Sequence, residues 1–462
     1  MTSRSSDFLE RTVGLFRSVW QRAGRRDDSA DALLADIDPD LPDDQIEVVR
    51  TQIDDALYGA PGELMARAKA ARLAERYLLL SPTGQQRFLL LLAVEYGPHA
   101  DELETALDSW KSGDTGTRGR AEADMREALR SPRARLLQRF TSLEHGVKFV
   151  VDLRAEVRTM AEENDDLAAF DAELLALLTE WFDFGFLTLE RITWEQSPAE
   201  VLERLIDYET VHEITSWDDL RNRLGPDRLL YAFFHPRMPN EPVIFVEVAL
   251  TSGIATSIEE LLDEQAPDTD PFESDTAVFY SINNCHTGLV GVPLGDFLIK
   301  KVVEELRGDL PHLTRFVTLS PVPGFRAWLE QVLDPDFESD GPTLDEVRRR
   351  ALRGMVSREN WHLDLDSTEM LKEPLLRLAA QYLLTERRGL QAHDRVANFH
   401  LRNGARLERI NWLANQSPAG ISLSAGLMVN YRYEPDFIEE NHEAYTTRGE
   451  VVASAEVRDL LD

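Results

Sequence analysis

The stretch from Thr276 to Phe325 constrains the fold of this chain more than any other part of it. Its first segment, TAVFYSI (276–282), is apolar and rich in aromatic and β-branched residues, as is typical of a buried strand. A glycine-punctuated loop (283–295) leads into DFLIKKVVEEL (296–306), where apolar residues recur at helical spacing beside a charged face. RFVTLS (315–320) predicts a second strand that runs into a sharp turn. We expect the rest of the chain to be organised around this strand, loop, helix and strand.

The loop carries three glycines, Gly288, Gly291 and Gly295. A loop that leaves a strand and opens a helix presents backbone N–H groups at the positive end of the helix dipole, an arrangement that binds phosphate or pyrophosphate. Alternatively, the glycines only let the chain turn tightly, and the pattern favours neither interpretation. The dinucleotide pattern G-x-G-x-x-G and the P-loop Gly-Lys-Ser/Thr are both absent. A bound anion is therefore expected to be the pyrophosphate of a nucleotide-tailed carrier rather than a nucleoside triphosphate.

The net charge of the chain excludes some classes of partner. Its 462 residues carry a formal net charge of −33. Proteins that bind nucleic acid have basic surfaces, so this charge argues against nucleic acid and against an anionic membrane surface as partners. An anionic ligand must then be attracted by a local field, because the global field repels it.

Cysteine and hydropathy patterns indicate the compartment. Cys285 is the only cysteine, so an intrachain disulfide and a cysteine-based zinc cluster are excluded, which suits a reducing compartment. Histidine spacing of the H-x-x-x-H kind is absent, and no metal is predicted. No apolar run approaches the ~20 residues that cross a bilayer, and we find no signal-peptide core or peroxisomal tripeptide. The chain is predicted to be cytoplasmic, with the amphipathic segment 8–26 as a first helix rather than a transit peptide.

Two domains are predicted. Residues 1–186 have helical periodicity almost throughout, which predicts a helical bundle that packs, oligomerises or covers a site. This part holds no constellation of histidine, cysteine and paired carboxylates suited to chemistry. From residue 187 to 462 strands interleave with helices, and DRLLYAFFHP and PVIFVEVALTS predict a hairpin. The fold class is therefore α+β, with an all-helical domain before a mixed-sheet domain.

Ser320 is a candidate site residue because it ends the predicted strand 315–320, just before Pro321. Open sheets of α/β proteins bind ligands at the carboxyl ends of their strands. Ser-Pro is also a common helix start, so a helix cap is the competing and more ordinary interpretation of Ser320. The dipeptide occurs at five places: Ser81, Ser131, Ser197, Ser320 and Ser417. No G-x-S-x-G surrounds Ser320, so the sequence does not support a hydrolase nucleophile.

His400, in ANFHLRNGA, is the candidate acid–base group. The more ordinary role for such a residue is a structural histidine bonded to backbone. Three other histidines compete with it: His235, His286 and His393. Tyr431 and Tyr433 follow the small-residue run SLSAGLM, which indicates either a backbone that something approaches closely or ordinary strand aromatics.

Several longer motifs occur together in one known family. YAFFHP, EPVIFVEVALTSGIATSI, VFYSIN, GLVGVPLGDFLIKKVVEEL, LSPVPGF, NFHLRNGARLERINWLA and GLMVNYRY follow in this order, and together they resemble malonyl-CoA decarboxylase. The similarity extends upstream through HGVKFVVDLRAEV and WFDFGFLTLERITW, and more weakly into LLLSPTGQQRFLLLLAVEYG. The resemblance implies an N-terminal helical domain and a C-terminal domain with the GNAT (acyl-CoA acyltransferase) fold. A homo-oligomer, dimer or tetramer, is expected through the helical domain.

The resemblance also implies roles for individual residues. Ser320 and His400 match the two principal catalytic residues of the family, and Ser281 and Tyr433 match supporting members of the site. The glycine loop is implied to hold the coenzyme A pyrophosphate through Gly288, Leu289, Val290, Gly291, Val292 and Gly295. An acidic residue often precedes the Leu-Gly that ends this loop in the family, whereas this chain has Pro293 there. A role for that carboxylate therefore does not carry over.

The implied reaction is the decarboxylation of malonyl-CoA to acetyl-CoA and CO2. Loss of CO2 leaves a thioester enolate, so the thioester is itself the electron sink and no cofactor or metal is required. Ser320 and His400 are expected to donate to the carboxylate and the thioester oxygen, with one of them relaying the proton. Two alternatives stay open at this point: a GNAT-fold acyltransferase that passes an acyl group to an amine, and a non-catalytic sensor that binds malonyl-CoA.

Overall fold

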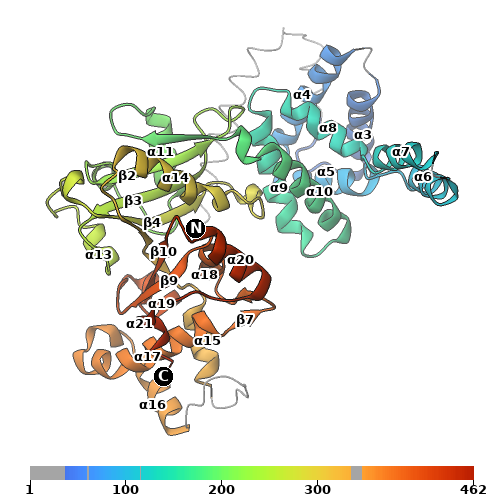
Figure 1. Cartoon of the computed structure of the whole chain (residues 1–462). Helices are drawn as coiled ribbons and strands as arrows, with labels where there is room; N and C mark the ends of the chain where they lie inside the picture. The colour runs from blue at the N-terminus through green and yellow to red at the C-terminus, as the bar shows by residue number, and fades with distance from the viewer. Residues whose placement is uncertain (1–36, 60–61, 115, 335–345, 462) are drawn as a thin grey trace. The chain divides into compact units, whose positions relative to one another are not determined.

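The computed structural model describes residues 37–59, 62–114, 116–334 and 346–461, which form two compact units (Figure 1). The first unit runs to Leu187 and also includes His235–Pro239 and His286–Pro293. The second consists of Thr188–Phe234, Asn240–Cys285 and the chain from Leu294 onward. The predicted first helix, 8–26, lies outside the described residues.

The first unit is helical, as the periodicity predicts. Its described helices are α3 (Asp43–Leu57), α4 (Glu63–Leu79), α5 (Pro82–Glu95), α6 (Ala100–Ser112), α7 (Arg118–Ala128), α8 (Pro132–Thr141), α9 (Gly146–Ala161) and α10 (Asp165–Trp181). Aromatic rings form part of the core, with the Tyr77 ring centroid 5.1 Å from that of Phe88 and 5.7 Å from that of Phe149. Such pairs add about 0.5–1.5 kcal/mol each beyond the burial of their area.

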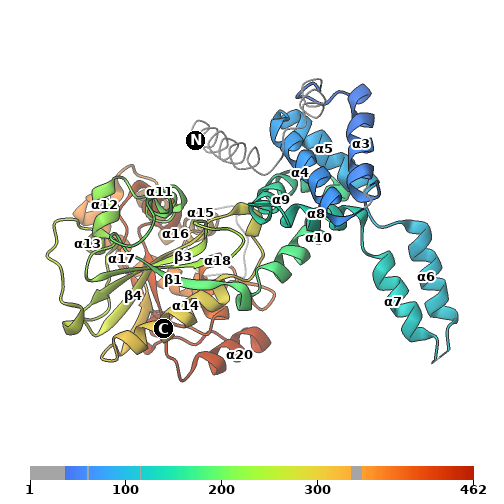
Figure 2. The ribbon, with the colours of Figure 1, turned by 90° about the horizontal axis from the view of Figure 1, so that it is seen from above.

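The second unit is built on one mixed sheet (Figure 2). Its strands are β1 (Thr188–Ile192), β2 (Arg228–Phe234), β3 (Pro242–Thr251), β4 (Thr276–Asn284), β5 (Arg315–Thr318), β6 (Ser320–Pro321), β9 (Arg406–Asn411) and β10 (Met428–Tyr433). Their order is β1-β2-β3-β4-β5-β10-β6, and β9 also pairs with β10. The predicted β2–β3 hairpin is confirmed. Only β4 and β5 are parallel among the described strands of this sheet.

Helices and a small hairpin surround the sheet. The hairpin pairs β7 (Arg387–Arg388) with β8 (Gln391–Ala392). The helices are α11 (Ala199–Tyr208), α12 (Trp217–Asn222), α13 (Ile258–Leu261), α14 (Gly295–Asp309), α15 (Phe325–Val332), α16 (Glu346–Val356), α17 (Leu365–Leu384), α18 (Arg395–Arg402), α19 (Pro418–Ser424), α20 (Ile438–Arg448) and α21 (Ala455–Arg458). One apolar cluster joins α11 and α12 to the sheet, and a second joins α13 to β3, β4, β5 and β10. The fold class α+β is confirmed.

None of the helices in the described ranges combines the length and the apolar character that a bilayer crossing requires.

The central stretch folds as its local pattern predicts, except at one end. β4, the glycine loop, α14 and β5 follow in the expected order, and the helix connects two neighbouring parallel strands. Pairing between these strands ends at Phe279 and Thr318. Ser281 and Ser320 each come two residues later, so the register brings both serines to the carboxyl ends of adjacent strands.

The prediction that Ser320 ends the strand was wrong by two residues. β5 ends at Thr318, and Ser320 begins β6, where it pairs with Val429 of β10. The cap interpretation of Ser320 was also wrong. Ser81, Ser131 and Ser417 do cap helices, each accepting the N–H three residues later with proline in the first turn. These three serines begin helices, whereas Ser320 pairs with β10 in the sheet.

Candidate active site

A buried chain of hydrogen bonds links four side chains of the second unit. Ser320 Oγ lies 3.0 Å from His400 Nε2 and 2.9 Å from Thr318 Oγ1. On the other side of the imidazole, His400 Nδ1 lies 2.8 Å from the hydroxyl of Tyr433. Ser320 is 6 % exposed, His400 2 % and Tyr433 1 %. Three of the four predicted catalytic residues, Ser320, His400 and Tyr433, are thus brought together out of bulk water.

The imidazole of His400 is held in a dry aromatic environment. The ring of Tyr431 stacks on it with centroids 4.6 Å apart and an interplanar angle of 24°, and Phe399 meets it edge-on at 5.0 Å. Burial lowers the pKa of His400 to about 3, because the charged imidazolium would lose its hydration here. His400 is therefore neutral at physiological pH.

A neutral imidazole has one donor and one acceptor nitrogen, and the chain accommodates both arrangements. In one, the Tyr433 O–H donates to Nδ1, Nε2–H donates to Ser320, and Ser320 donates to Thr318. In the other, Ser320 donates to Nε2 and Nδ1–H donates to Tyr433. Conversion of the first arrangement into the second requires one proton to enter at Tyr433 and one to leave at Ser320, so the site can relay a proton without charging the ring.

Buried polar side chains connect the elements that carry these groups. Asp394 caps α18 by accepting the N–H groups of Val396 and Ala397, and it also accepts the N–H of Gly324 in the turn after Ser320. Asn430 of β10 donates to the carbonyl of Thr318 at 2.7 Å. The helix bearing His400 and the strand bearing Tyr433 are thereby each fixed to the segment bearing Thr318 and Ser320.

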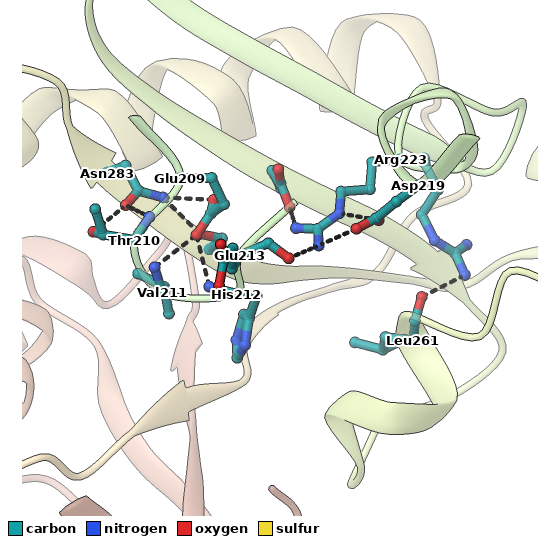
Figure 3. Close-up of polar contacts among 12 residues, drawn as sticks. Glu209, Thr210, Val211, His212, Glu213, Asp219, Arg223, Leu261 and Asn283 are labelled. Atoms are coloured by element: carbon teal, nitrogen blue, oxygen red, sulfur yellow. Dashed lines mark hydrogen bonds and ion pairs between the residues drawn. The ribbon is translucent and has the colours of Figure 1, made fainter. Parts of the chain in front are cut away.

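Ser281, the fourth predicted catalytic residue, belongs to a different cluster. Its hydroxyl donates to Glu209 Oε2 at 2.7 Å, and its Oγ accepts from the Asn283 amide at 2.8 Å. The Asn283 amide also donates to Glu209 Oε2 at 2.7 Å (Figure 3). Oε1 of Glu209 accepts the N–H groups of Val211 and His212. Burial raises the pKa of Glu209, and the hydrogen bonds from His212, Ser281 and Asn283 oppose that shift by stabilising the anion. Since the hydroxyl proton of Ser281 is engaged by Glu209, Ser281 offers a substrate an acceptor rather than a donor.

The same cluster contains a buried ion network. Arg223, the residue that follows α12, bonds Asp219 through Nε at 2.8 Å and Glu247 of β3 through Nη1 at 3.1 Å. Glu247 is fully buried, and burial followed by the nearby charge of Glu209 raises its pKa to about 8. One guanidinium therefore faces more carboxylates than it can neutralise.

All three loop glycines have a steric reason to be glycine. A Cβ on Gly288 would lie 1.8 Å from the carbonyl oxygen of Val151, and a Cβ on Gly295 would lie 2.4 Å from the ring of Phe399. Gly291 has φ +91°, in the region that favours glycine. Close packing alone thus accounts for the pattern, so the glycines by themselves do not identify an anion site.

Much of the loop backbone is engaged internally. The N–H groups of Leu289, Val290 and Val292 each donate to the carbonyl three residues earlier. Among the described residues, the N–H of Gly291 makes no such backbone bond. The loop, His286–Pro293, belongs to the first compact unit, while Ser320, His400 and Tyr433 belong to the second.

The competing histidines have other surroundings. His235 Nδ1 accepts the N–H of Arg237 and its ring packs against Phe182. His393 contacts the Tyr382 hydroxyl and Arg388, each at 3.3 Å. His286 begins the glycine loop. Of the four, His400 is the one shown between a serine and a tyrosine hydroxyl.

Sequence reasoning missed several members of the two clusters. Thr318 and Asn283 each lie two positions from a predicted residue, and strand alternation places such neighbours on one face, so this pattern could have found them. Glu209 is 72 residues from Ser281, and no local pattern connects the two. No group of three or more His, Cys, Asp or Glu suited to a metal ion occurs within the part of the chain that the structure describes.

Comparisons with known proteins cover most of the chain. A family model described as the malonyl-CoA decarboxylase C-terminal domain matches residues 185–462, and one described as the malonyl-CoA decarboxylase N-terminal domain matches residues 96–182. The chain is 40 % identical over 348 residues to mitochondrial malonyl-CoA decarboxylase of Anser anser anser, which covers 71 % of this chain and 69 % of that protein. With the Rattus norvegicus protein of the same name it shares 38 % identity over 363 residues, 74 % of this chain and 73 % of the relative.

Solved structures agree with these matches. The chain superimposes on malonyl-CoA decarboxylase from Rhodopseudomonas palustris with a TM-score of 0.83 and 40 % identity, covering 89 % of this chain and 99 % of that one. For malonyl-CoA decarboxylase from Agrobacterium vitis the TM-score is 0.84 at 41 % identity, covering 90 % of this chain and 99 % of that one.

Proposed function

The chain belongs to the malonyl-CoA decarboxylase family, and we propose that its reaction takes place at the hydrogen-bonded chain of Ser320, His400 and Tyr433. The protein is a carboxy-lyase that converts malonyl-CoA to acetyl-CoA and CO2. The observation that carries the proposed site is the 3.0 Å contact between Ser320 Oγ and His400 Nε2, buried between strand and helix.

The reaction breaks the bond between the α-carbon and the carboxylate, and its electron pair passes into the thioester as an enolate. CO2 leaves and the α-carbon takes one proton. The protein must hold the carboxylate out of the thioester plane, donate a hydrogen bond to the growing enolate oxygen and supply that proton. Fixed donors in a water-excluded site are usually the largest contribution to such catalysis. The thioester is the electron sink, so we propose a reaction independent of cofactor and metal.

The imidazole of His400 stays neutral throughout the proton transfer in this proposal. Because His400 has a pKa of about 3, imidazolium is not its resting form. The imidazole instead takes a proton from Tyr433 at Nδ1 as it releases one from Nε2 to Ser320, along the contacts of 2.8 and 3.0 Å, and the hydroxyl proton of Ser320 passes to the α-carbon of the enolate. Solvent then restores the proton of Tyr433. Ser281, held by Glu209, supports the site as a hydrogen-bond acceptor for the substrate.

The glycine loop is proposed to bind the pyrophosphate of coenzyme A, through Gly288, Leu289, Val290, Gly291, Val292 and Gly295. The N–H of Gly291 and the start of α14 at Gly295 support this role, since helix starts bind anions. A GNAT-like fold is proposed for residues 187–462. The supporting feature is the central strand β4 followed by the loop and a crossover helix.

The assay that tests the function uses mass spectrometry of malonyl-CoA incubated with the purified protein, with a chelator present and no amine acceptor. We expect stoichiometric acetyl-CoA. Replacing His400 by alanine is expected to lower kcat by about 10²–10⁴-fold, the usual scale for an acid–base group. His393→Ala is the matched control and is expected to keep wild-type turnover.

Three outcomes of this assay would count against the proposal. Intact malonyl-CoA would indicate a sensor, and release of free coenzyme A only after an amine is added would indicate an acyltransferase. Near-normal kcat in His400→Ala would remove this residue from the mechanism.

We also propose that the protein is cytoplasmic, has neither nucleic acid nor membrane as a partner, and is a homo-oligomer, a dimer or tetramer, through its helical unit. The charge of −33 and the single, buried Cys285 support the first two statements. Exposed apolar side chains on α4 and α5, such as Leu64 and Val94, support the third. Light scattering of the purified protein tests the oligomer: a monomeric mass would contradict it.

A further inference from the structure

Arg154 connects a helix of the first unit to the glycine loop. The side chain leaves α9 and is 1 % exposed. Its Nη1 donates to two loop carbonyls, that of Gly288 at 2.6 Å and that of Val290 at 2.9 Å. Its Nε bonds Asp171 of α10 at 2.9 Å. A buried guanidinium with three such partners is an oriented clamp on the loop, because its planar donors fix the direction of each bond.

The clamp determines which way the loop peptides face. In a trans peptide the C=O of one residue and the N–H of the next point in opposite directions. The carbonyl of Val290 points at Arg154, so the N–H of Gly291 points away from it, and the positive φ of Gly291 permits this turn. The carbonyl oxygens of Gly288 and Val290, which carry partial negative charge, therefore face Arg154 on α9. The N–H of Gly291 faces the opposite side and can donate a hydrogen bond there.

We propose that Arg154 is a positioning residue that keeps the glycine loop in the shape that binds the coenzyme A pyrophosphate. This inference rests on the proposed role of the loop. Asp171 neutralises the charge of Arg154, so the residue acts through the orientation of the loop backbone and not by attracting the phosphates itself. Helix α9 then contributes to substrate binding without contributing a group that touches the substrate.

The chain offers a matched control for the loss of a buried arginine. Arg133 of α8 is 4 % exposed, pairs with Glu173 of α10 at 2.6 Å and donates to the carbonyl of Ala93 in α5 at 2.6 Å. It resembles Arg154 in burial, acidic partner and carbonyl contact, but its carbonyl partner lies in a helix. A merely structural effect of losing an arginine should therefore appear in both variants.

The experiment compares malonyl-CoA with malonyl-pantetheine, a thioester that lacks the pyrophosphate, using the full-length protein. In the wild type we expect a KM for malonyl-CoA at least about tenfold below that for malonyl-pantetheine. Arg154→Gln is expected to raise the KM for malonyl-CoA by about tenfold, the scale of one charged hydrogen bond. It should leave kcat and the KM for malonyl-pantetheine unchanged within about twofold. Arg133→Gln should alter neither KM.

The outcomes separate this inference from the proposed function. Equal KM values for the two substrates in the wild type would mean that the loop does not bind pyrophosphate. If the wild type prefers malonyl-CoA and Arg154→Gln keeps the preference, or if Arg133→Gln loses it equally, Arg154 is not a positioning residue. Should Arg154→Gln fail to fold, Arg154→Lys replaces it, since lysine keeps the charge but lacks the fork that reaches both carbonyls and Asp171. Its KM for malonyl-CoA should rise in the same direction, and an unchanged value would overturn the inference.

Discussion

At the scale of single residues, the chemistry of His400 is set by its burial among aromatic rings. Its pKa of about 3 lies below the value of about 6.5 for an exposed histidine. The turnover rate kcat is therefore expected to show no ionisation of His400 between about pH 6 and 8. The check is a pH profile of kcat for the wild type, with His393→Gln as a control that keeps the profile. A change of kcat near pH 6.5 that is also present in His393→Gln would contradict a neutral His400.

The lowered pKa of His400 also makes the stability of the folded protein depend on pH. Between about pH 3 and 6.5 the unfolded chain binds a proton at His400 that the folded protein does not, so this residue makes stability rise with pH through that window. Its contribution is complete above the unfolded pKa and is lost as the pH falls toward 3. Protonation of His400, the residue that is neutral in the folded site, therefore favours unfolding in acid.

Two tyrosines beside His400 provide a paired test of the hydrogen-bonded chain. The Tyr433 hydroxyl bonds Nδ1, whereas the Tyr431 hydroxyl has no hydrogen-bond partner in the described part of the structure. Tyr433→Phe is expected to lower kcat by about 10–100-fold, because it removes one buried donor and keeps the ring. Tyr431→Phe keeps the stacked ring, so its kcat should stay within about threefold of the wild type. Steady-state kinetics of both variants provide the measurement, and equal losses would contradict a specific role for the Tyr433 hydroxyl.

At the scale of elements, the sequence predicted those helices and strands that are determined by residues close together in the chain. The apolar run of β4, the helical spacing of α14 and the aromatic strands β2 and β3 were all visible, because each element's own side chains set its period. The end of β5 was not, because the pairing of Ser320 with Val429 of β10 depends on a strand 109 residues later. For the same reason the sequence identified Ser281 but not Glu209, its partner across the fold.

The ion pairs of Arg223 with Asp219 and with Glu247 of β3 give a stability prediction. Glu247 binds its proton more tightly when folded, with a pKa of about 8, than in an unfolded chain, where it is about 4.3. The folded protein therefore holds more protons in this window, and the contribution of Glu247 to stability falls as pH rises through it. Glu247→Gln removes that loss and is expected to unfold at a higher temperature than the wild type at about pH 8, but not at about pH 5.

Arg223→Gln is the contrasting variant. This substitution leaves Asp219 and Glu247 without their cation. It is expected to lower the free energy of unfolding by about 3–5 kcal/mol, the usual effect of an unpaired buried charge. Thermal unfolding of both variants across this pH range is the measurement. A lower melting temperature for Glu247→Gln at high pH would show that the ion pair outweighs the burial of the carboxylate.

At the scale of the whole molecule, the site is a product of long-range folding. Ser320 and His400 are 80 residues apart, and His400 and Tyr433 are 33 apart. Composition and periodicity predicted a helical part and a mixed-sheet part, and the family motifs identified which serine and histidine matter. Neither source showed that the glycine loop belongs to the same compact unit as α9 and α10. Helix α9 therefore contacts the loop proposed to bind the coenzyme A pyrophosphate, which the sequence of the helical part does not reveal.

The proposed mechanism requires above all that Ser320 and His400 act as one unit. The most direct test is kcat for malonyl-CoA decarboxylation in Ser320→Ala, in His400→Ala and in the double variant. Residues that act together are strongly non-additive, so we predict that the double variant is no more than about threefold slower than the slower single variant. If the two losses instead multiply, the serine and the histidine work independently, and the hydrogen bond between them is not the centre of the mechanism.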